Sequence, residues 1–382
     1  MAFSPESAIK TNGARDGEPI RVMVVDDSVI IRGLLTRILE TESDISVVAS
    51  VGNGKLALEK LERIREIDVV LLDIEMPVMD GLTALPLLLK ASRTVKVIMA
   101  STLTKKNAEV SIKAMQLGAA DYIPKPTSNA DMGGASDFKR EIVAKVMSLG
   151  QARRRQVGGP SAGAKPVAET AAVKKPLFNK PVMLRDPGKS KPDILAIGSS
   201  TGGPQALFAF LKGIPLNPGL PVVITQHMPA TFTSILAEHI AKTTGWPCSE
   251  GEDGIPLTGG RVFLAPGGYH MVIETRGVDK IIRLNQDPPE NFCRPAVDPM
   301  FRSVAAAFGP RAIGVILTGM GSDGAKGGKV MVDAGATIAV QDEETSVVWG
   351  MPGSAATSGI CSAVLPITEL SQYVDKILNR PF

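Results

Sequence analysis

One stretch, residues 193–207 (DILAIGSSTGGPQAL), constrains the fold more than any other part of the chain. It opens with a short apolar run that predicts a buried strand. A glycine-rich turn follows, and then Pro204, which suits the first turn of a helix because its missing N–H has no partner there. A strand, a tight turn and a helix with Ser200 at the apex match the G-x-S-x-G spacing of a nucleophile elbow. A phosphate-binding turn fits the same features, so this stretch alone leaves both interpretations open.

Length and composition limit the remaining possibilities. The 382 residues are enough for two domains, and the net charge of +3 does not indicate bulk nucleic-acid binding. The three cysteines lie far apart without the spacing of a disulfide framework or a zinc site. No apolar run approaches the length of a membrane helix, and the N-terminus lacks the apolar core of a signal peptide. We therefore expect a cytoplasmic protein that is not inserted in a membrane.

The first part of the chain alternates between predicted strands and helices. Apolar runs at 20–25, 45–51, 68–72, 95–99 and 122–123 predict strands, and amphipathic segments between them predict helices. Ser28 is expected to cap the first helix, and a helix from about Gly81 is expected to be interrupted by Pro86. Five such repeats predict a doubly wound parallel sheet.

Polar residues follow these predicted strands where ligands bind in such sheets. They are Asp26, Asp27, Asp73, Ser101 and Lys125. Three carboxylates on one edge repel one another unless a cation is present, and oxygen ligands suit Mg²⁺. A hydroxyl and an ammonium beside them suit a phosphoryl group. Either aspartate of the first pair, taken alone, is explained as a helix cap, but the five residues together favour the phosphoryl site.

Residues 20 to about 149 resemble the receiver domains of response regulators, which have a flavodoxin-like fold. The resemblance is carried by VVDDS (24–28), LLDIEMPVMDG (71–81), Ser101 and Lys125-Pro126. It implies phosphorylation at Asp73. It implies Mg²⁺ bound directly by Asp27, Asp73 and the Glu75 carbonyl, and through water by Asp26. It also implies that Ser101 and Lys125 sense the phosphoryl group.

Residues 151–192 change in composition to Gly, Pro, Ala, Lys and Arg without helical or strand periodicity. This composition predicts a flexible basic tether, whose charge is better explained by solubility and reach than by a nucleic-acid partner. A short apolar run at 182–184 leaves docking on either domain open. The predicted organisation is a disordered N-terminus (1–19), a receiver (20–149), a linker (150–190) and a second domain (191–382).

The second domain is predicted to be α/β with a mainly parallel sheet and an antiparallel insertion formed by 270–274 and 280–284. Ser200, His227 and Asp323 each follow a predicted strand. Parallel neighbouring strands would place all three at one edge, where a serine needs a base and the base needs an orienting carboxylate.

The other candidates for base and acid are weaker on position. His239 falls on the apolar face of a predicted helix, where a core histidine is expected, and His270 follows a Pro-Gly-Gly turn and stays a less favoured base. Asp298 is expected to cap the helix that follows it, and Asp342 begins an acidic loop expected to be solvated. Ser199, beside Ser200, leaves the nucleophile slightly ambiguous.

Residues 193–382 resemble the catalytic domain of the chemotaxis protein-glutamate methylesterase (CheB) family, a Rossmann-like domain. The motifs are AIGSSTGG (196–203), TQHMP (225–229), LAPGGYHM (264–271), RPAVDPMF (294–301), LTGMGSDG (317–324) and QDEETSVVWGMPGSA (341–355). The resemblance implies Ser200 as nucleophile, His227 as base and Asp323 as orienting acid. Backbone N–H groups near Thr201 and Met320 are implied as the oxyanion hole.

The whole chain is therefore expected to be a phosphorylation-activated methylesterase. The resemblance implies hydrolysis of glutamate methyl esters on chemoreceptors without a cofactor, deamidation of receptor glutamines, and a chemotaxis histidine kinase as phosphodonor. Three alternatives remain: a phosphorylation-dependent scaffold with a weak or inactive hydrolase domain, a DNA-binding response regulator, and an esterase for small metabolites. The second would need a basic helix-turn-helix after the linker, which residues 193–382 do not offer.

Overall fold

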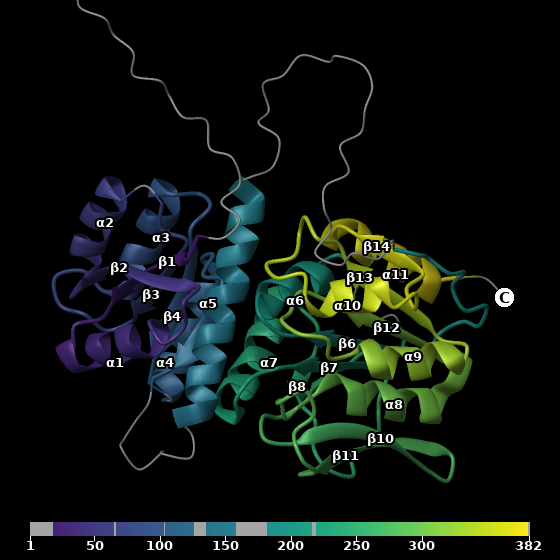
Figure 1. Cartoon of the computed structure of the whole chain (residues 1–382). Coiled ribbons are helices and arrows are strands. Elements are labelled where there is room, and N and C mark those ends of the chain that lie inside the picture. The colour runs from purple at the N-terminus through teal and green to yellow at the C-terminus, as the bar shows by residue number, and fades with distance from the viewer. Residues whose placement is uncertain are drawn as a thin grey trace, which may run out of the picture.

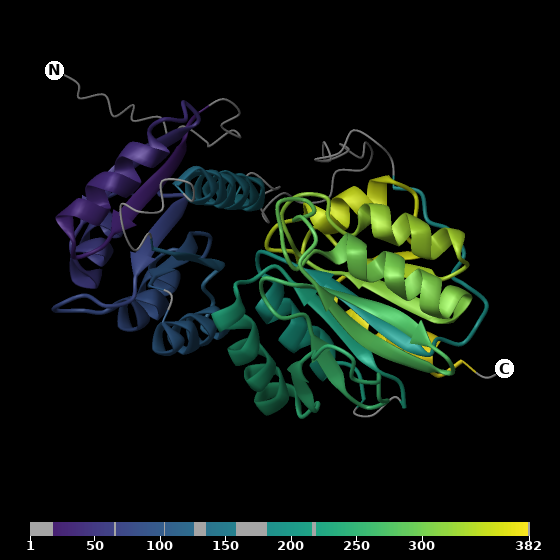
Figure 2. The ribbon, with the colours of Figure 1, turned by 90° about the horizontal axis from the view of Figure 1, so that it is seen from below.

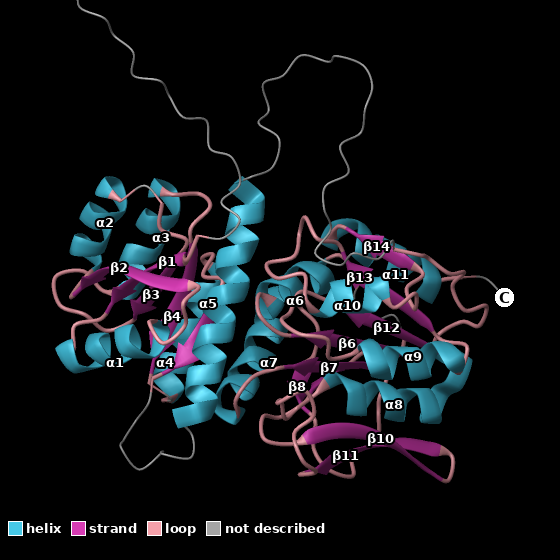
Figure 3. Cartoon of the chain, viewed as in Figure 1, coloured by secondary structure: helices cyan, strands magenta, loops and turns pink. Residues whose placement is uncertain are grey.

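The computed structural model describes residues 18–64, 66–102, 104–125, 135–157, 182–215 and 219–380, with side chains of α5 described from 137. Most of the predicted disordered N-terminus and residues 158–181 of the predicted linker lie outside this range. Within it, no helix is long and apolar enough to cross a membrane. The described residues form two α/β domains side by side (Figures 1 and 3).

The first domain is a five-stranded parallel sheet in the order β2-β1-β3-β4-β5, as expected for a flavodoxin-like receiver. Its strands are β1 (Ile20–Val25), β2 (Ile45–Val51), β3 (Val69–Asp73), β4 (Lys96–Ser101) and β5 (Asp121–Pro124). Its helices are α1 (Val29–Leu39), α2 (Gly54–Arg63), α3 (Gly81–Ala91), α4 (Lys105–Gln116) and α5 (Ala135–Val157). Helices α1 and α5 pack on one face of the sheet, while α2, α3 and α4 pack on the other.

Local sequence explains most of these boundaries. Ser28 is the N-cap of α1, because its Oγ accepts the N–H of Ile31 (3.4 Å). The expected interruption at Pro86 is wrong, since α3 continues through it. Proline removes one helical hydrogen bond, and burial of Leu85 and Leu88 on either side of it offsets that loss. The expected absence of helix from 151 onward is also wrong over 151–157, where α5 continues to Val157.

The second domain contains a seven-stranded sheet in the order β14-β13-β12-β6-β7-β9-β8, whose strand pairs are all parallel, and a separate antiparallel hairpin. Its strands are β6 (Ile194–Ser199), β7 (Val222–Gln226), β8 (Cys248–Glu250), β9 (Val262–Leu264), β10 (His270–Arg276), β11 (Asp279–Asn285), β12 (Ala312–Ile316), β13 (Thr337–Gln341) and β14 (Ala363–Leu365). Its helices are α6 (Gly203–Lys212), α7 (Ala230–Thr244), α8 (Val297–Phe308), η1 (Gly309–Arg311), α9 (Ala325–Asp333), α10 (Met351–Thr357) and α11 (Ile367–Leu378).

Helices cover both faces of this sheet. The apolar residues of α6, α7 and α11 pack on one face, and those of α8, α9 and α10 pack on the other together with the β10–β11 hairpin. The antiparallel insertion predicted from the sequence is this hairpin. The predicted α/β class with two mainly parallel sheets is therefore confirmed.

The two domains meet through α4 and β5 of the first and through α6 and α7 of the second (Figure 2). The ring of Tyr122 in β5 stacks on the ring of Phe232 in α7, with centroids 4.2 Å apart. One cluster of buried apolar residues runs from the α2–α4 face of the first sheet into the α6–α7 face of the second. The domain contact is therefore a shared apolar core and not only a polar surface.

Candidate active site and receiver site

The glycine-rich stretch folds as the sequence predicts. Strand β6 ends at Ser199, and α6 begins at Gly203 after Gly202 with a φ of 75°. A side chain is disfavoured at Gly202 by this left-handed backbone and by the contact its Cβ would make with Val347. The N–H of Ser200 donates to the carbonyl of Thr318 (3.0 Å), which ties the turn to the loop after β12.

The neighbouring serines have different surroundings. Ser199 is fully buried, and its Oγ donates to Oε1 of Gln226 (2.7 Å). The same glutamine donates from Nε2 to the carbonyl of Ser200 (2.9 Å). Ser200 itself is partly exposed. The difference in exposure therefore favours Ser200 over Ser199 as the serine that can contact a substrate.

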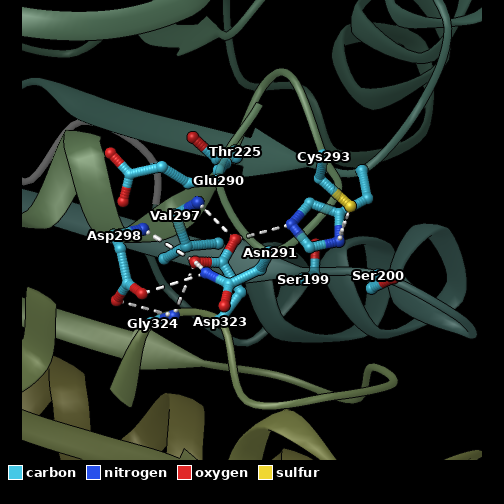
Figure 4. A network of polar contacts seen from close by, with 12 residues as sticks. Ser199, Ser200, Thr225, Glu290, Asn291, Cys293, Val297, Asp298, Asp323 and Gly324 are labelled. Carbon is cyan, nitrogen blue, oxygen red and sulfur yellow. Dashed lines mark hydrogen bonds and ion pairs between the residues drawn. The ribbon is translucent and has the colours of Figure 1, made fainter. Parts of the chain in front are cut away.

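Ser200, His227 and Asp323 come from adjacent strands. Strands β12, β6 and β7 are neighbours in the sheet, and each residue lies in the loop after one of them. Nε2 of His227 lies 2.7 Å from Oδ2 of Asp323. In Figure 4 Asp323 lies to the left, with Cys293 and Ser200 to the right. Within the described contacts Ser200 Oγ has no hydrogen bond to His227. In enzymes without bound substrate the distance between nucleophile and base is often too long for a hydrogen bond and shortens when substrate binds.

Asp323 is 1 % exposed and is held by several donors. Its Oδ2 accepts the N–H of Val297 (2.6 Å), and its Oδ1 accepts the N–H of Asp298 (3.0 Å). Burial raises the pKa of Asp323, whereas the hydrogen bond and the charge of His227 lower it. The lowering is the larger effect, so the pKa of Asp323 lies below its ordinary value. Asp323 is therefore a carboxylate that can orient the imidazole.

Cys293 was not predicted as a site residue, yet its Sγ lies 3.3 Å from Nδ1 of His227. Because Asp323 engages Nε2, Nδ1, which lies against Cys293, is the nitrogen through which His227 would take a proton from Ser200. Burial lowers the pKa of His227, whereas Cys293 and Asp323 raise it, and the outcome is a rise to about 10. Nothing in the spacing of the sequence indicates this contact, since Cys293 lies in a turn that is far from His227 along the chain.

The alternative histidines have structural contacts. His270 is buried, accepts the N–H of Ala296 at Nδ1 (3.2 Å) and faces the carbonyl of Pro288 with Nε2 (3.2 Å). His239 was expected in the core, but it is only partly buried at the domain contact, 3.5 Å from Nε2 of Gln116. Neither contacts Asp323 in the described contacts.

Asp298 was expected to cap the helix that follows it, and this prediction is wrong. It lies in the first turn of α8, whose N-cap is Ala296. Its Oδ1 instead accepts the N–H groups of Gly324 (3.0 Å) and Gly327 (2.6 Å), at the start of α9. Asp298 therefore caps a different helix from the one predicted, beside Asp323. The predicted solvated residue Asp342 is partly buried and accepts the N–H of Thr345 (3.0 Å).

Two backbone groups beside Ser200 are candidates for an oxyanion hole. The N–H of Ser200 is bound to Thr318, and the N–H of Gly319 donates to the carbonyl of Val348 (3.0 Å). Among the described contacts, the next N–H group along each loop, those of Thr201 and Met320, has no acceptor. A Cβ on Gly319 would lie 2.8 Å from Cβ of Ser200, so the two loops approach closely.

The receiver residues also converge. One carboxylate oxygen from each of Asp26, Asp27 and Asp73 lies within 4.8 Å of the others. Nζ of Lys125 lies 2.6 Å from Asp26 and 2.7 Å from Asp73. Burial is the largest effect on Asp73 and raises its pKa above the ordinary value. Clustered carboxylates of this kind fit a small divalent cation with water as further ligands.

The remaining receiver residues lie around this cluster. Ser101 is buried at the end of β4, and its Oγ lies 3.2 Å from Oγ of Ser111 in α4. The Glu75 side chain points to the surface, 3.5 Å from Lys106, so only its carbonyl remains as the expected ligand. A Cβ at Gly81 would collide with the carbonyl of Asp73, so this position needs glycine.

Comparisons with known proteins give the relationship of the chain. A family model for the CheB methylesterase matches residues 195–374, and one for the response regulator receiver domain matches residues 22–135. A protein-glutamate methylesterase/protein-glutamine glutaminase of Paramagnetospirillum magneticum is 59% identical over 95% of this chain and 97% of its own. The chain belongs to the CheB family.

A second relative covers a similar share of the chain, whereas two solved structures each cover one domain. A protein-glutamate methylesterase/protein-glutamine glutaminase of Azospirillum brasilense is 53% identical over 98% of this chain and 97% of its own. Among solved structures, the Thermotoga maritima CheB methylesterase catalytic domain is 36% identical, with a TM-score of 0.48, and covers 49% of this chain and 100% of its own. The response regulator domain of Thermotoga maritima CheB is 35% identical, with a TM-score of 0.32, over 35% and 98%.

Proposed function

We propose that this chain hydrolyses glutamate methyl esters on chemoreceptors and deamidates receptor glutamines. The observation that carries the proposal is the placement of Ser200, His227 and Asp323 after three adjacent strands, with His227 and Asp323 in hydrogen-bond contact. The names of the family relatives, protein-glutamate methylesterase/protein-glutamine glutaminase, support the substrate class. The absence of a cofactor in the chemistry is an expectation from the resemblance.

In the first half of the reaction Ser200 Oγ attacks the γ-carbonyl carbon of the ester. Nδ1 of His227 accepts the serine proton, while Asp323 holds the imidazole through Nε2. The N–H groups of Thr201 and Met320 are proposed to stabilise the negative oxygen of the tetrahedral intermediate. When that intermediate collapses, the carbon–oxygen bond to methoxide breaks, His227 returns the proton, and methanol leaves an acyl-enzyme on Ser200.

In the second half water replaces methanol. His227 takes a proton from water as it attacks the acyl-enzyme, and the bond to Ser200 Oγ breaks as the proton returns to the serine. The product is a glutamate carboxylate. A glutamine substrate passes through the same acyl-enzyme, with ammonia leaving in place of methanol, so one site serves both reactions.

The receiver site is proposed to take a phosphoryl group on Asp73 from a phosphohistidine of a chemotaxis kinase. The phosphorus–nitrogen bond breaks as a phosphorus–oxygen bond forms. Asp26, Asp27, Asp73 and the Glu75 carbonyl would hold Mg²⁺, which supplies positive charge to the phosphoryl oxygens when bound. Lys125 is already within ion-pair distance of Asp73, and Ser101 lies at the end of the adjacent strand.

The docked arrangement is proposed to restrain the hydrolase until Asp73 is phosphorylated. Thr201, next to the nucleophile, donates from Oγ1 to Oδ2 of Asp121 in β5 (2.7 Å), and both residues are buried. Arg140 of α5 lies over the ring of Phe292, 4.4 Å from its centroid, near the site. A receptor helix that reaches Ser200 would compete with these contacts. The proposed activity on chemoreceptors implies an enzyme that works in the cytoplasm and is recruited to receptor arrays.

The test is methanol release from methylated receptor membranes, with and without a small phosphodonor and Mg²⁺. We expect release to rise with phosphodonor and to vanish in Ser200→Ala. Ser199→Ala is the matched control and should retain release, because Ser199 is buried against Gln226. Release from Ser200→Ala would contradict the assigned nucleophile, and no release in any condition would favour the scaffold alternative.

A further inference from the structure

The loop between β11 and α8 contains a tight turn with an unusual backbone. Glu290 and Cys293 exchange two backbone hydrogen bonds, 3.1 and 2.9 Å long. The two residues between them, Asn291 and Phe292, have φ values of 51° and 63°. Positive φ at both central positions is the pattern of a type I′ turn, in which glycine or asparagine is favoured at these positions and phenylalanine is not. The turn is therefore strained at Phe292.

Strain of this kind persists where surrounding contacts determine the conformation. The first residue of the turn, Glu290, is paired with Arg302 of α8 at 2.9 and 2.5 Å. The last residue, Cys293, contacts Nδ1 of His227. The turn is thus fixed to a helix at one end and to the proposed base at the other.

Asn291 joins the turn to the acid behind His227. Its Nδ2 donates to Oδ1 of Asp323 (2.8 Å) and to Oδ2 of Asp298 (3.1 Å). Both carboxylates are 1 % exposed, whereas Asn291 is an exposed residue. Its amide therefore bridges two buried carboxyl groups and donates to one oxygen of each (Figure 4).

An amide is the side chain that fits this place. Two adjacent carboxylates repel each other, and a donor shared between them offsets the repulsion without adding another charge. Asparagine also tolerates the left-handed backbone better than most residues with a side chain. The strained turn is what brings this amide to Asp323, because Asn291 lies at its first central position.

We propose that Asn291 is a positioning residue of the hydrolase, which holds Asp323 oriented so that Oδ2 receives the hydrogen bond of His227 Nε2. The inference rests on the proposed Ser200–His227–Asp323 site and adds a residue to it. Asn291 has no contact with Ser200 in the described contacts, so its effect on the reaction passes through Asp323.

Two glycine variants separate the amide from the turn. Asn291→Gly removes the amide but keeps a residue that adopts positive φ without strain. Phe292→Gly is the matched control, since it keeps Asn291 and relieves strain at the adjacent position. Both are measured with saturating phosphodonor and Mg²⁺, so that the Arg140–Phe292 contact does not enter the comparison. Thermal unfolding monitored by circular dichroism checks that each variant is folded.

We expect Asn291→Gly to lower kcat by about tenfold to a hundredfold with KM unchanged, as for a small misplacement of a catalytic group. Phe292→Gly should keep the wild-type kcat. An unchanged kcat in Asn291→Gly would overturn the proposal, as would an equal loss in both variants.

A second measurement does not depend on turnover. The chain has three histidines, so selective ¹⁵N labelling makes the Nε2–H resonance of His227 identifiable by comparison with a His227→Gln variant. We expect this resonance to move in Asn291→Gly and to stay in place in Phe292→Gly and Ser200→Ala. A lower kcat with an unmoved resonance would overturn the positioning role. Activity in Ser200→Ala would instead refute the proposed nucleophile, while the resonance would still report on Asn291 and Asp323.

Discussion

Gln205 offers the most direct measure of the proposed restraint of the hydrolase by the receiver. It lies in the first turn of α6, directly after the Ser200 turn, and its side chain crosses to the other domain. Its Nε2 donates to the carbonyl of Met115 (3.0 Å) in the last turn of α4 and to that of Ala119, between α4 and β5. The perturbation is Gln205→Ala, which removes both hydrogen bonds and leaves the proposed catalytic residues unchanged.

The expected magnitude follows from these contacts. Two hydrogen bonds contribute about 1–3 kcal/mol to docking. Oε1 of Gln205 is buried without a hydrogen-bond partner among the described residues. Removing this unfavourable group offsets part of the docking energy lost with the two hydrogen bonds. A net loss of about 1–2 kcal/mol corresponds to a factor of roughly 5–30 in the ratio of docked to released receiver. Methanol release without phosphodonor should rise by a similar factor while the docked form dominates.

The assay is methanol release from methylated receptor membranes at several enzyme concentrations, with and without phosphodonor. Gln156→Ala is the control, because Gln156 is an exposed helical glutamine that accepts a hydrogen bond from Lys96 within the receiver. The two variants and the wild type should have similar rates once phosphorylated. If Gln205→Ala kept the wild-type rate without phosphodonor, these contacts would not restrain the enzyme and the reasoning would be refuted.

Three further predictions concern single positions. Gly319→Ala should lower kcat of the phosphorylated enzyme by about tenfold or more, because the new Cβ would lie 2.8 Å from Cβ of Ser200; an unchanged kcat would contradict this close packing. Cys293→Ala removes a group that raises the pKa of His227, so the acidic limb of the kcat/KM profile, below which the base is protonated, should move to lower pH; a move to higher pH would contradict the contact. Asp73→Asn should keep the basal rate of methanol release and lose the response to phosphodonor, whereas a wild-type response would place the phosphoryl group elsewhere.

The sequence was sufficient for most of the two sheets. Buried parallel strands are apolar runs that end in polar residues, and this contrast located β1, β2 and β6 within a residue or two. The short strands β8 and β14 were not predicted, because three residues carry no measurable periodicity. Helix α11 was also left out, although its buried Leu370, Val374 and Ile377 form an amphipathic pattern that was sufficient to predict it.

The catalytic candidates were predictable for a related reason. Each follows an apolar strand, so a parallel sheet alone brings Ser200, His227 and Asp323 to one edge. Asn291 and Cys293 come from a turn between a hairpin and a helix, where the order of the sheet gives no position. Their contacts depend on the positive φ values of the turn, and an Asn-Phe pair is not the sequence that predicts such a turn.

Strand β5 links the two sites by a short path. Asp121 at its first position accepts the hydrogen bond of Thr201, and Lys125, directly after its last residue, is paired with Asp73. Four residues of strand span only about 13 Å, so a change in the position of Lys125 acts on the same short segment that contacts the neighbour of Ser200. Helix α4 makes a second link. Its Ser111 contacts Ser101, and the carbonyl of Met115 near its end accepts a hydrogen bond from Gln205. A phosphoryl group on Asp73 would contact both Lys125 and Ser101. Both links end at the strand–turn–helix segment that carries Ser200. The proposed nucleophile and the proposed phosphorylation site are therefore joined by two rigid elements, which is the arrangement needed for one covalent change to alter access to the other site.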